Sequence, residues 1–348
     1  MKWLRFIFIP FGIVFALITF LRNKFYDWEI FKSSKFSIPI IGIGNLSVGG
    51  TGKTPHTAYL IELLKKDFNL FTLSRGYGRK KRGFIIANEN STANDIGDEP
   101  LLYQKRYGAE IGVAVESNRV LGVIEICSKH PETNLILLDD AYQHRSIQPG
   151  LNILITTYSK SFYKDYILPV GDLREWRSGK TRADIIVVSK CPDISEKEKE
   201  QIIEKINPRA EQHVFFSSIK YLSQRSFDAP LNQMNLEGRP IILVTAIANA
   251  SYLREYLEKS SRILSHFEFN DHYDFKATDI TEVHNLFDKF VSEDPVIVTT
   301  EKDAMRLYRE DLLEEMKNYP WVVQEIGIEL DREVEFNELV MSYVEKNS

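Results

Sequence analysis

The sequence predicts an α/β protein built on a mostly parallel sheet with helices on both faces. Its 348 residues suit two domains of ordinary size. From Pro39 onward, short and almost continuously apolar segments alternate with helical stretches, a pattern typical of buried parallel strands. A glycine-rich turn joins the first of these strands to the first helix.

The composition argues against several classes of protein. With 43% hydrophobic and 27% charged residues, the chain has the make-up of a folded protein rather than a disordered or polytopic membrane protein. A net charge of −5 argues against a general nucleic-acid binder, which needs excess Lys and Arg. The two cysteines, Cys127 and Cys191, are far apart and form no C-x-x-C pair, which disfavours a disulfide framework or a structural zinc site.

The N-terminus carries a hydrophobic segment flanked by basic residues. Phe6 to Leu21 is a run of 16 uncharged residues, which as a helix would reach about 24 Å, short of the roughly 30 Å hydrocarbon core of a bilayer. No small-residue cleavage site follows it, which disfavours a removed secretory signal. We therefore expect an uncleaved, membrane-associated helix lying in one leaflet. A helix buried against the protein's own core is the alternative.

The order of the segments predicts four regions. We assign residues 1–35 to the hydrophobic helix and its linker, 36–213 to the first α/β domain, 214–238 to a connector, and 239–348 to a smaller second α/β domain. The apolar segments of the first domain are 38–46, 68–76, 109–115, 134–141, 151–157 and 183–189, with helices expected at 53–66 and 196–205. A long, half-exposed strand is expected at 213–227, and further apolar segments follow at 240–248, 262–269, 295–304 and 321–330, before a final helix.

The glycine-rich turn NLSVGGTGKTP is similar to the phosphate-binding loop G-x-x-x-x-G-K-[ST], with Ser47 at the place of the first glycine. Its glycines allow successive N–H groups to converge on phosphate oxygens, and the following helix adds partial positive charge. Lys53 would reach the β- and γ-phosphates, and the Thr54 hydroxyl would bind Mg²⁺. The predicted nucleotide-binding residues are Ser47, Val48, Gly49, Gly50, Thr51, Gly52, Lys53 and Thr54. The alternative is an ordinary turn between a strand and a helix.

A pair of carboxylates, Asp139 and Asp140, follows the apolar strand of LILLDDAYQH. Open α/β sheets bind their ligands at the carboxyl ends of their strands. We therefore predict that one of the two approaches the Mg²⁺ ion held by Thr54, directly or through water. An acidic surface turn is the alternative.

The motifs together resemble those of the tetraacyldisaccharide 4′-kinase family of Gram-negative bacteria. They occur in the family's order and approximate spacing: GNLSVGGTGKTP, LSRGYGR, GDEP, LDDAYQH, GDLRE, FNDHYDF and TEKDA. The chain departs from the family at Ala141, where Gly is usual, and at Tyr273, where a second His is common.

This resemblance implies an enzyme that uses ATP and Mg²⁺ to phosphorylate the 4′-hydroxyl of an acylated disaccharide 1-phosphate lipid, giving lipid IVA for lipid A biosynthesis. It also implies attachment to the cytoplasmic face of the inner membrane, peripherally or monotopically through the N-terminal helix, and a connector in the form of a β-ribbon. The prediction that the nucleotide is ATP and not GTP depends on the family resemblance, because VVSKCPD only faintly resembles the base-reading N-K-x-D motif of GTPases.

The same resemblance assigns the proton-accepting base to Asp98, working with His272 across the two domains. A sugar hydroxyl is a poor nucleophile at neutral pH, so a positioned base should contribute about 10²- to 10⁴-fold. Domain closure would bring the pair together and exclude water. The alternatives are an exposed turn for Asp98 and a core histidine for His272.

Cations must also converge on the transferred phosphoryl group and on the acceptor's own phosphate. The candidates for transition-state contacts are Arg174 and Arg119, and those for substrate contacts are Arg75, Tyr77, Gln143, Glu175 and Lys302. Packing or surface pairing is the alternative for Tyr77, Gln143 and Glu175.

Two rival hypotheses come from other functional classes. A membrane-recruited P-loop ATPase switch would use a similar loop to act through protein partners, and would need neither Asp98 nor His272. A non-catalytic scaffold would leave the loop unexplained.

Overall fold

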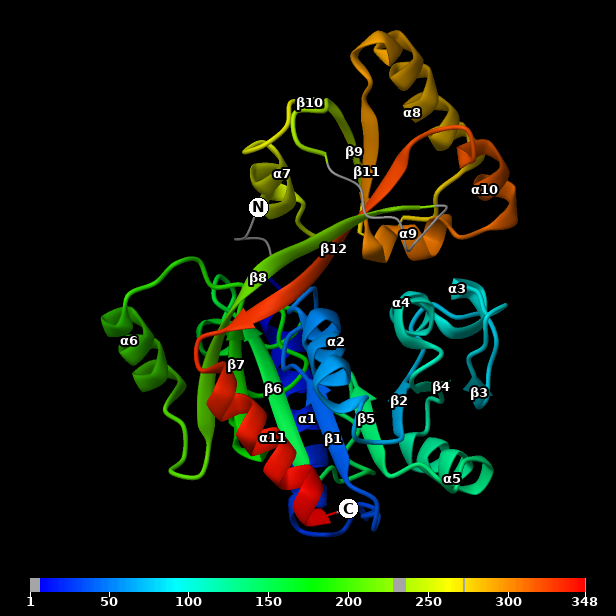
Figure 1. Cartoon of the computed structure of the whole chain (residues 1–348). Coiled ribbons are helices and arrows are strands. Elements are labelled where there is room, and N and C mark those ends of the chain that lie inside the picture. The colour runs from blue at the N-terminus through cyan, green and yellow to red at the C-terminus, as the bar shows by residue number, and fades with distance from the viewer. Residues whose placement is uncertain (1–6, 228–235, 272, 348) are drawn as a thin grey trace.

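The computed structural model describes residues 7–227, 236–271 and 273–347. The predicted relay residue His272 lies outside these residues, as do Met1 to Phe6 at the start of the hydrophobic segment. The described chain forms two lobes that share one sheet, with the larger lobe at the bottom of Figure 1 and the smaller at the top.

A 12-stranded sheet runs through both lobes in the order β10-β9-β11-β12-β8-β7-β6-β1-β5-β2-β4-β3. The strands of the larger lobe are β1 (Ile40–Gly44), β2 (Leu70–Ser74), β3 (Ile85–Ile86), β4 (Gly112–Val115), β5 (Leu135–Asp139), β6 (Leu151–Thr157), β7 (Ile185–Ser189) and β8 (His213–Ser226). Those that continue into the smaller lobe are β9 (Ile241–Thr245), β10 (Ile263–Glu268), β11 (Val296–Thr300) and β12 (Trp321–Leu330). All neighbours pair in parallel except β3 with β4 and β8 with β12.

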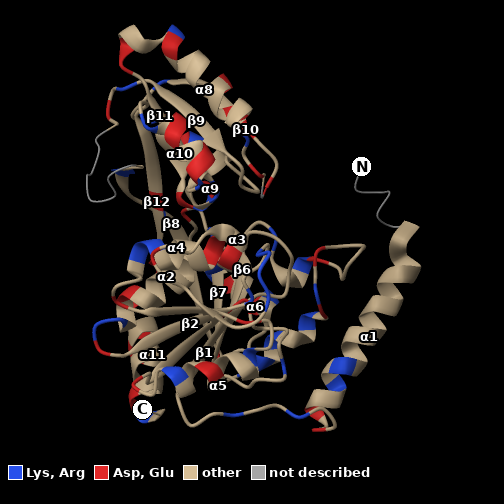
Figure 2. Ribbon diagram, turned by 90° about the vertical axis from the view of Figure 1, so that its right-hand side faces the viewer, with Lys and Arg blue, Asp and Glu red and all other residues tan. Residues whose placement is uncertain are grey.

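Helices occupy the segments between the strands. They are α1 (Ile9–Asp27), α2 (Lys53–Leu64), α3 (Ala93–Ile96), α4 (Asp98–Tyr107), α5 (Arg119–Lys129), α6 (Glu196–Ile206), α7 (Ser251–Leu257), α8 (Ala277–Lys289), α9 (Glu301–Leu307), α10 (Glu310–Met316) and α11 (Glu333–Asn347). In the larger lobe, α11 and α1 lie on opposite sides of the sheet (Figures 1 and 2). Because β1, β2, β5 and β7 are buried along their whole length, their sequences are almost continuously apolar.

The two lobes are connected by an antiparallel ribbon of β8 and β12. The first residues of β8 pair in parallel with β7, and the strand then continues upward to pair with β12 (Figure 1). The predicted connector at 214–238 contains the first of these strands, whereas its partner comes from residues 321–330. The ribbon is therefore closed by residues that are distant in sequence.

The final helix, α11, belongs by its contacts to the larger lobe, although the predicted division placed residues 239–348 together. The Tyr343 hydroxyl donates to the Ile40 carbonyl and accepts from the Ile40 N–H, both at 3.1 Å. Tyr59 donates to Asn337 at 2.8 Å, and the buried Phe336 ring packs edge-on against Phe215. After β12 the chain thus returns to cover the sheet near its first strand.

Helix α1 lies at the side of the larger lobe and is exposed along most of its length (Figure 2), while Phe15 and Ala16 pack against the lobe's core. Gly12 is its one buried residue, and a Cβ there would lie 2.9 Å from Cγ2 of Val170. The end of the helix is fixed by polar contacts: Arg22 donates to the Gln143 carbonyl at 2.7 Å, and Arg145 pairs with Asp27 at 2.8 Å. By length and composition α1 can cross a membrane.

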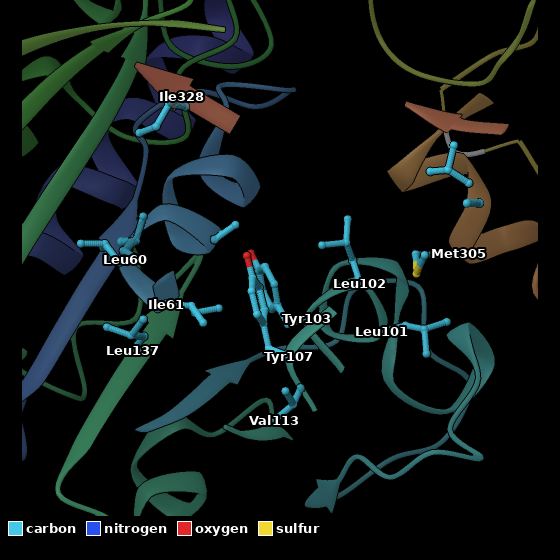
Figure 3. Close-up of a cluster of buried hydrophobic side chains, with 14 of the residues drawn as sticks. Leu60, Ile61, Leu101, Leu102, Tyr103, Tyr107, Val113, Leu137, Met305 and Ile328 are labelled. Carbon is cyan, nitrogen blue, oxygen red and sulfur yellow. The ribbon is translucent and has the colours of Figure 1, made fainter. Parts of the chain in front are cut away.

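A hydrophobic core fills the larger lobe and continues into the smaller one. Figure 3 shows Tyr103 and Tyr107 of α4 among the side chains of this core, with Met305 of α9 beside Leu101 and Leu102. Contacts between α4 and α9 therefore join the lobes at a second place, in addition to the ribbon.

Candidate active site

A cavity of about 750 Å³ lies between the lobes. The glycine-rich loop, the start of α4 and the carboxyl end of β5 line it on the larger lobe, and residues around Asn249, Asp271 and Lys302 line it on the smaller lobe. This is the edge of the sheet at which open α/β proteins bind their ligands.

The loop has the backbone that phosphate binding requires. Gly49 and Gly52 have φ values of +100° and +92°, a region that favours glycine. Ser189 donates to the Thr51 carbonyl at 2.6 Å, and Lys190 donates to the Gly50 carbonyl at 2.8 Å. Side chains thereby hold two carbonyls of the turn. An anion would be bound by N–H groups of the turn other than that of Thr51, which donates to the Gly49 carbonyl at 2.9 Å.

The entry to the loop explains why serine replaces the expected first glycine. Ser47 forms an antiparallel bridge with Leu173, and the Val48 N–H donates to the Asp172 carbonyl at 2.8 Å. Arg174 N–H donates in turn to the Leu46 carbonyl at 2.7 Å. The entry is thus strand-like, which any residue can adopt, and the pairing brings Arg174 beside the loop.

Lys53 and Arg174 converge on Asp140. The Lys53 ammonium lies 3.4 Å from Asp140 Oδ1, and Arg174 Nη1 donates to both Asp140 oxygens at 3.0 Å. Burial would raise the pKa of Asp140, but the two cations hold it below its usual value. Both cations line the cavity, where a phosphate could share them with the carboxylate.

Asp139 is fully buried beneath this pair. Tyr103 donates to Asp139 Oδ2 at 2.9 Å, while the buried Oδ1 atom has no hydrogen-bond partner. Burial and the nearby Glu99 charge raise the pKa of Asp139 to about 7. The side chain of Thr54 donates to Glu99 at 3.1 Å. An ionised Asp139 would therefore be stabilised by a cation at this place.

Thr54, Asp139 and Asp140 fit Mg²⁺, since the ion prefers oxygen ligands and Asp139 has an unused oxygen. Within the described chain no three His, Cys, Asp or Glu side chains converge as a complete metal site. Mg²⁺ is usually held by one or two carboxylates together with substrate phosphates and water.

Asp98 lies at the first position of α4 and lines the cavity. Its Oδ2 atom accepts a hydrogen bond of 2.7 Å from Nε of Arg306, a residue of the smaller lobe. The predicted base thus contacts both lobes.

The remaining predicted residues divide into two groups. Arg75, Tyr77, Gln143 and Lys302 line the cavity, and Lys302 lies 3.6 Å from Asp271. Arg119 and Glu175 do not line it. Arg119 is buried behind Asp139, where it donates to the Glu116 carbonyl at 2.5 Å and burial lowers its pKa to about 10.

Glu175 is buried and accepts hydrogen bonds from Asn23, Gln143 and Arg182 at 2.7, 3.0 and 2.8 Å. These contacts connect α1 to the segment that carries Arg174. Glu175, a candidate substrate contact from the sequence, thus lies in this hydrogen-bond network and not in the lining of the cavity.

Sequence reasoning missed four residues of the site: His56, Ser189, Lys190 and Arg306. The ring of His56 contacts the Gly52 carbonyl at 2.7 Å and the Ser217 hydroxyl at 2.9 Å, and burial lowers its pKa to about 4. It is the second residue after the loop's Thr54, which was the available signal. Ser189 and Lys190 occur in VVSKCPD, but they fix the loop rather than match a base-reading motif.

A phosphate-binding loop, an acidic pair and convergent cations at the carboxyl edge of a mostly parallel sheet define a nucleotide-binding protein of the P-loop class. The family model for tetraacyldisaccharide-1-P 4′-kinase, LpxK, matches residues 4–345. The chain therefore belongs to the tetraacyldisaccharide 4′-kinase family.

Individual relatives agree with this assignment over the full length. The tetraacyldisaccharide 4′-kinase of Bacteroides thetaiotaomicron is 39% identical, with 100% of this chain and 94% of the relative covered. The enzyme of the same name from Flavobacterium johnsoniae is 38% identical, with 100% and 99% covered. Among solved structures, LpxK from Aquifex aeolicus in complex with ATP matches with a TM-score of 0.76 and 27% identity, over 98% of this chain and 99% of that one.

Proposed function

We propose that this protein transfers the γ-phosphoryl group of ATP to the 4′-hydroxyl of a tetraacyldisaccharide 1-phosphate, at the cytoplasmic face of the bacterial inner membrane. The observation that carries the proposal is that one cavity is lined both by the phosphate loop and by the Asp98 carboxylate. A phosphoryl donor and a base for the acceptor can thus meet in one cavity.

In this proposal the loop N–H groups and Lys53 bind the triphosphate. Asp98 accepts the proton of the 4′-hydroxyl while the sugar oxygen bonds to the γ-phosphorus and the bond to the β,γ-bridging oxygen breaks. Arg174 would contact the transferred group, and its hydrogen bond to Asp140 beside Lys53 supports this role. Mg²⁺ held by Thr54, Asp139 and Asp140 would neutralise phosphate charge.

Arg75, Gln143, Tyr77 and Lys302 are the proposed contacts of the acceptor, because they line the cavity around the loop. We assign supporting roles to Arg119 and Glu175, which lie outside that lining. Arg119 places a buried positive charge behind Asp139, and Glu175 holds the segment that presents Arg174. His272 is retained as the proposed partner of Asp98 on the basis of the family resemblance.

The acceptor carries acyl chains, so the site should work at a lipid surface. Helix α1 supports this, because large apolar side chains such as Phe11, Ile13 and Leu17 are more than half exposed. Its polar contacts with the larger lobe would keep the cavity at a fixed place relative to the bilayer.

The direct test is to incubate the purified protein with γ-labelled ATP, Mg²⁺ and a panel of acylated glucosamine disaccharide 1-phosphates, and to locate the label. We expect label at the 4′ position of the disaccharide. The Asp98→Ala variant should lose this transfer while its affinity for ATP is kept. A membrane-recruited ATPase switch would instead release phosphate and label no lipid, and transfer that is unaffected in Asp98→Ala would remove Asp98 as the base.

A further inference from the structure

We propose that Arg306 is a positioning residue for the reaction: it holds the Asp98 carboxylate from the opposite lobe and so fixes the direction in which this carboxylate meets the acceptor hydroxyl. This inference rests on the proposed function, in which Asp98 accepts the proton. It adds a residue of the smaller lobe that is described in the structure and that sequence motifs did not single out.

The contact is direct and shielded from water. Arg306 Nε donates to Asp98 Oδ2 at 2.7 Å, although the two residues are 208 positions apart in the chain. The side chains are 7% and 16% exposed. A charge-assisted hydrogen bond in such surroundings is stronger and better oriented than a surface ion pair.

The smaller lobe holds the guanidinium group independently of Asp98. Arg306 Nη1 donates to Asp303 Oδ1 at 3.1 Å and to the Ala246 carbonyl at 3.2 Å. The fully buried Asp303 is itself fixed, since its Oδ2 atom accepts from the Ala246 N–H at 3.0 Å and from the Thr300 hydroxyl at 2.8 Å. The group that contacts Asp98 is therefore preorganised.

The surrounding contacts fix the position of α4 relative to α9. Met305, the neighbour of Arg306, packs beside Leu101 and Leu102 of α4 (Figure 3). A second pair between the same two helices joins Arg106 to Glu301 at 3.6 Å. The position of Asp98 is thus set from α9 as well as from its own helix.

The shape of the side chain matters for this role. Arginine can donate from Nε to Asp98 and from Nη1 to Asp303 at the same time, because its donors form a rigid planar fork. A lysine would keep the charge but has one small ammonium group. A glutamine would lose the charge altogether.

The test compares Arg306→Gln and Arg306→Lys in the full-length protein, with Arg262→Gln as the matched control. Arg262 belongs to the same lobe but pairs with Glu293 at the surface, outside the lining of the cavity. Steady-state transfer from labelled ATP to the disaccharide lipid is measured, together with the KM values for both substrates.

For Arg306→Gln we expect kcat to fall about 10²-fold, the effect of misplacing a catalytic group by about 1 Å, while both KM values stay within about threefold. Arg306→Lys should recover part of kcat, and Arg262→Gln should behave as wild type. An unchanged kcat in Arg306→Gln, or a lysine variant no better than the glutamine one, would overturn the proposal.

A double variant keeps the test decisive if Arg306→Gln also weakens folding. If Arg306 acts through Asp98, adding Arg306→Gln to Asp98→Asn should reduce the residual rate no further. A further loss as large as in the wild-type background would contradict the proposal. If the wild-type protein transfers no label to lipid, the proposed function is wrong, and this inference is wrong with it. If the wild-type protein and the Arg306→Gln variant are both fully active, only the inference is wrong.

Discussion

Two regions that line or adjoin the cavity are built in different ways. In the first, which we call the loop end, residues between Asn45 and Thr54 form the phosphate loop within a single turn of the chain, and Ser189 and Lys190 donate hydrogen bonds to two of its carbonyls. In the second, which we call the lobe junction, Asp98 and Arg106 of α4 meet Glu301 and Arg306 of α9, and the contact of Asp98 with Arg306 joins residues that are 208 positions apart.

This difference suggests how the two steps of the proposed reaction are controlled. The loop can bind a nucleotide whatever the position of the smaller lobe, because the residues that hold it, including Ser189, Lys190 and Leu173, all belong to the larger lobe. The lobe junction exists only while the β8–β12 ribbon and the α4–α9 contact hold the lobes together. Nucleotide binding and placement of the base should therefore respond to different mutations.

The largest effect is expected at the loop end. Lys53→Met removes the cation that faces Asp140 and the phosphates, so kcat/KM should fall by about 10³-fold or more, the scale of a lost phosphate-stabilising cation. Labelled-phosphate transfer and ATP titration measure the two steps, and circular dichroism controls for folding. Wild-type affinity for ATP together with a normal rate would remove Lys53 from the site.

The next effect concerns the lobe junction. Arg106→Gln leaves the buried Glu301 without its ion-pair partner, which should lower the free energy of unfolding by about 2 to 4 kcal/mol, as for other broken buried pairs. Urea unfolding measures this change, and ATP affinity should stay near that of wild type. Weakened ATP binding with unchanged stability would contradict the conclusion that the loop end and the lobe junction respond to different mutations.

The effect of Arg106→Gln on stability should also depend on pH. Burial raises the pKa of Glu301 in the folded protein. At pH values just above the usual carboxyl pKa, the folded state therefore binds more protons than the unfolded state. The free energy of unfolding consequently rises as the pH falls through this window. The decrease in the free energy of unfolding caused by Arg106→Gln should therefore be smaller at pH 5 than at pH 8. Equal losses at both values would show that Glu301 is not the group left unpaired.

A smaller effect is expected from the surface of α1, which belongs to neither the loop end nor the lobe junction. Replacing Phe11, Ile13 and Leu17 with serine should move the protein to the soluble fraction and raise the KM for the lipid about tenfold, since several apolar side chains no longer enter the bilayer. The KM for ATP should not change. Unaltered sedimentation with vesicles would exclude this face as the membrane contact.

The smallest effect tests the return of α11 to the larger lobe. Tyr343→Phe removes the hydroxyl that contacts the Ile40 N–H and carbonyl, and should lower the free energy of unfolding by about 1 to 2 kcal/mol. Asn347→Ala, which loses only an exposed contact within α11, is the control. Equal stability of the two variants would mean that this contact adds nothing to the lobe.

Local features of the site could be predicted from the sequence because their signals are contiguous. The glycine-rich loop with Lys53 and Thr54 follows the apolar strand β1, and Asp139 and Asp140 stand at the end of the apolar strand β5. Parallel strands bring their carboxyl ends to one edge of the sheet. The strand–helix alternation likewise predicted the mostly parallel sheet that the structure contains. Each of these inferences needed only neighbouring residues.

Other features depended on contacts between distant segments. Glu175 follows Arg174 directly, yet it turns to Asn23 and Arg182, and α11 follows the smaller lobe in sequence but packs on the larger one. Nothing in the residues around Arg306 indicates Asp98 as its partner. The sequence by itself determined the strands, the phosphate loop and the chemistry of its cations, because backbone conformation and local charge are short-range properties. Only the tertiary structure decided which side chains share the cavity, since that depends on how β8 and β12 pair and on how the buried surfaces of the two lobes fit together.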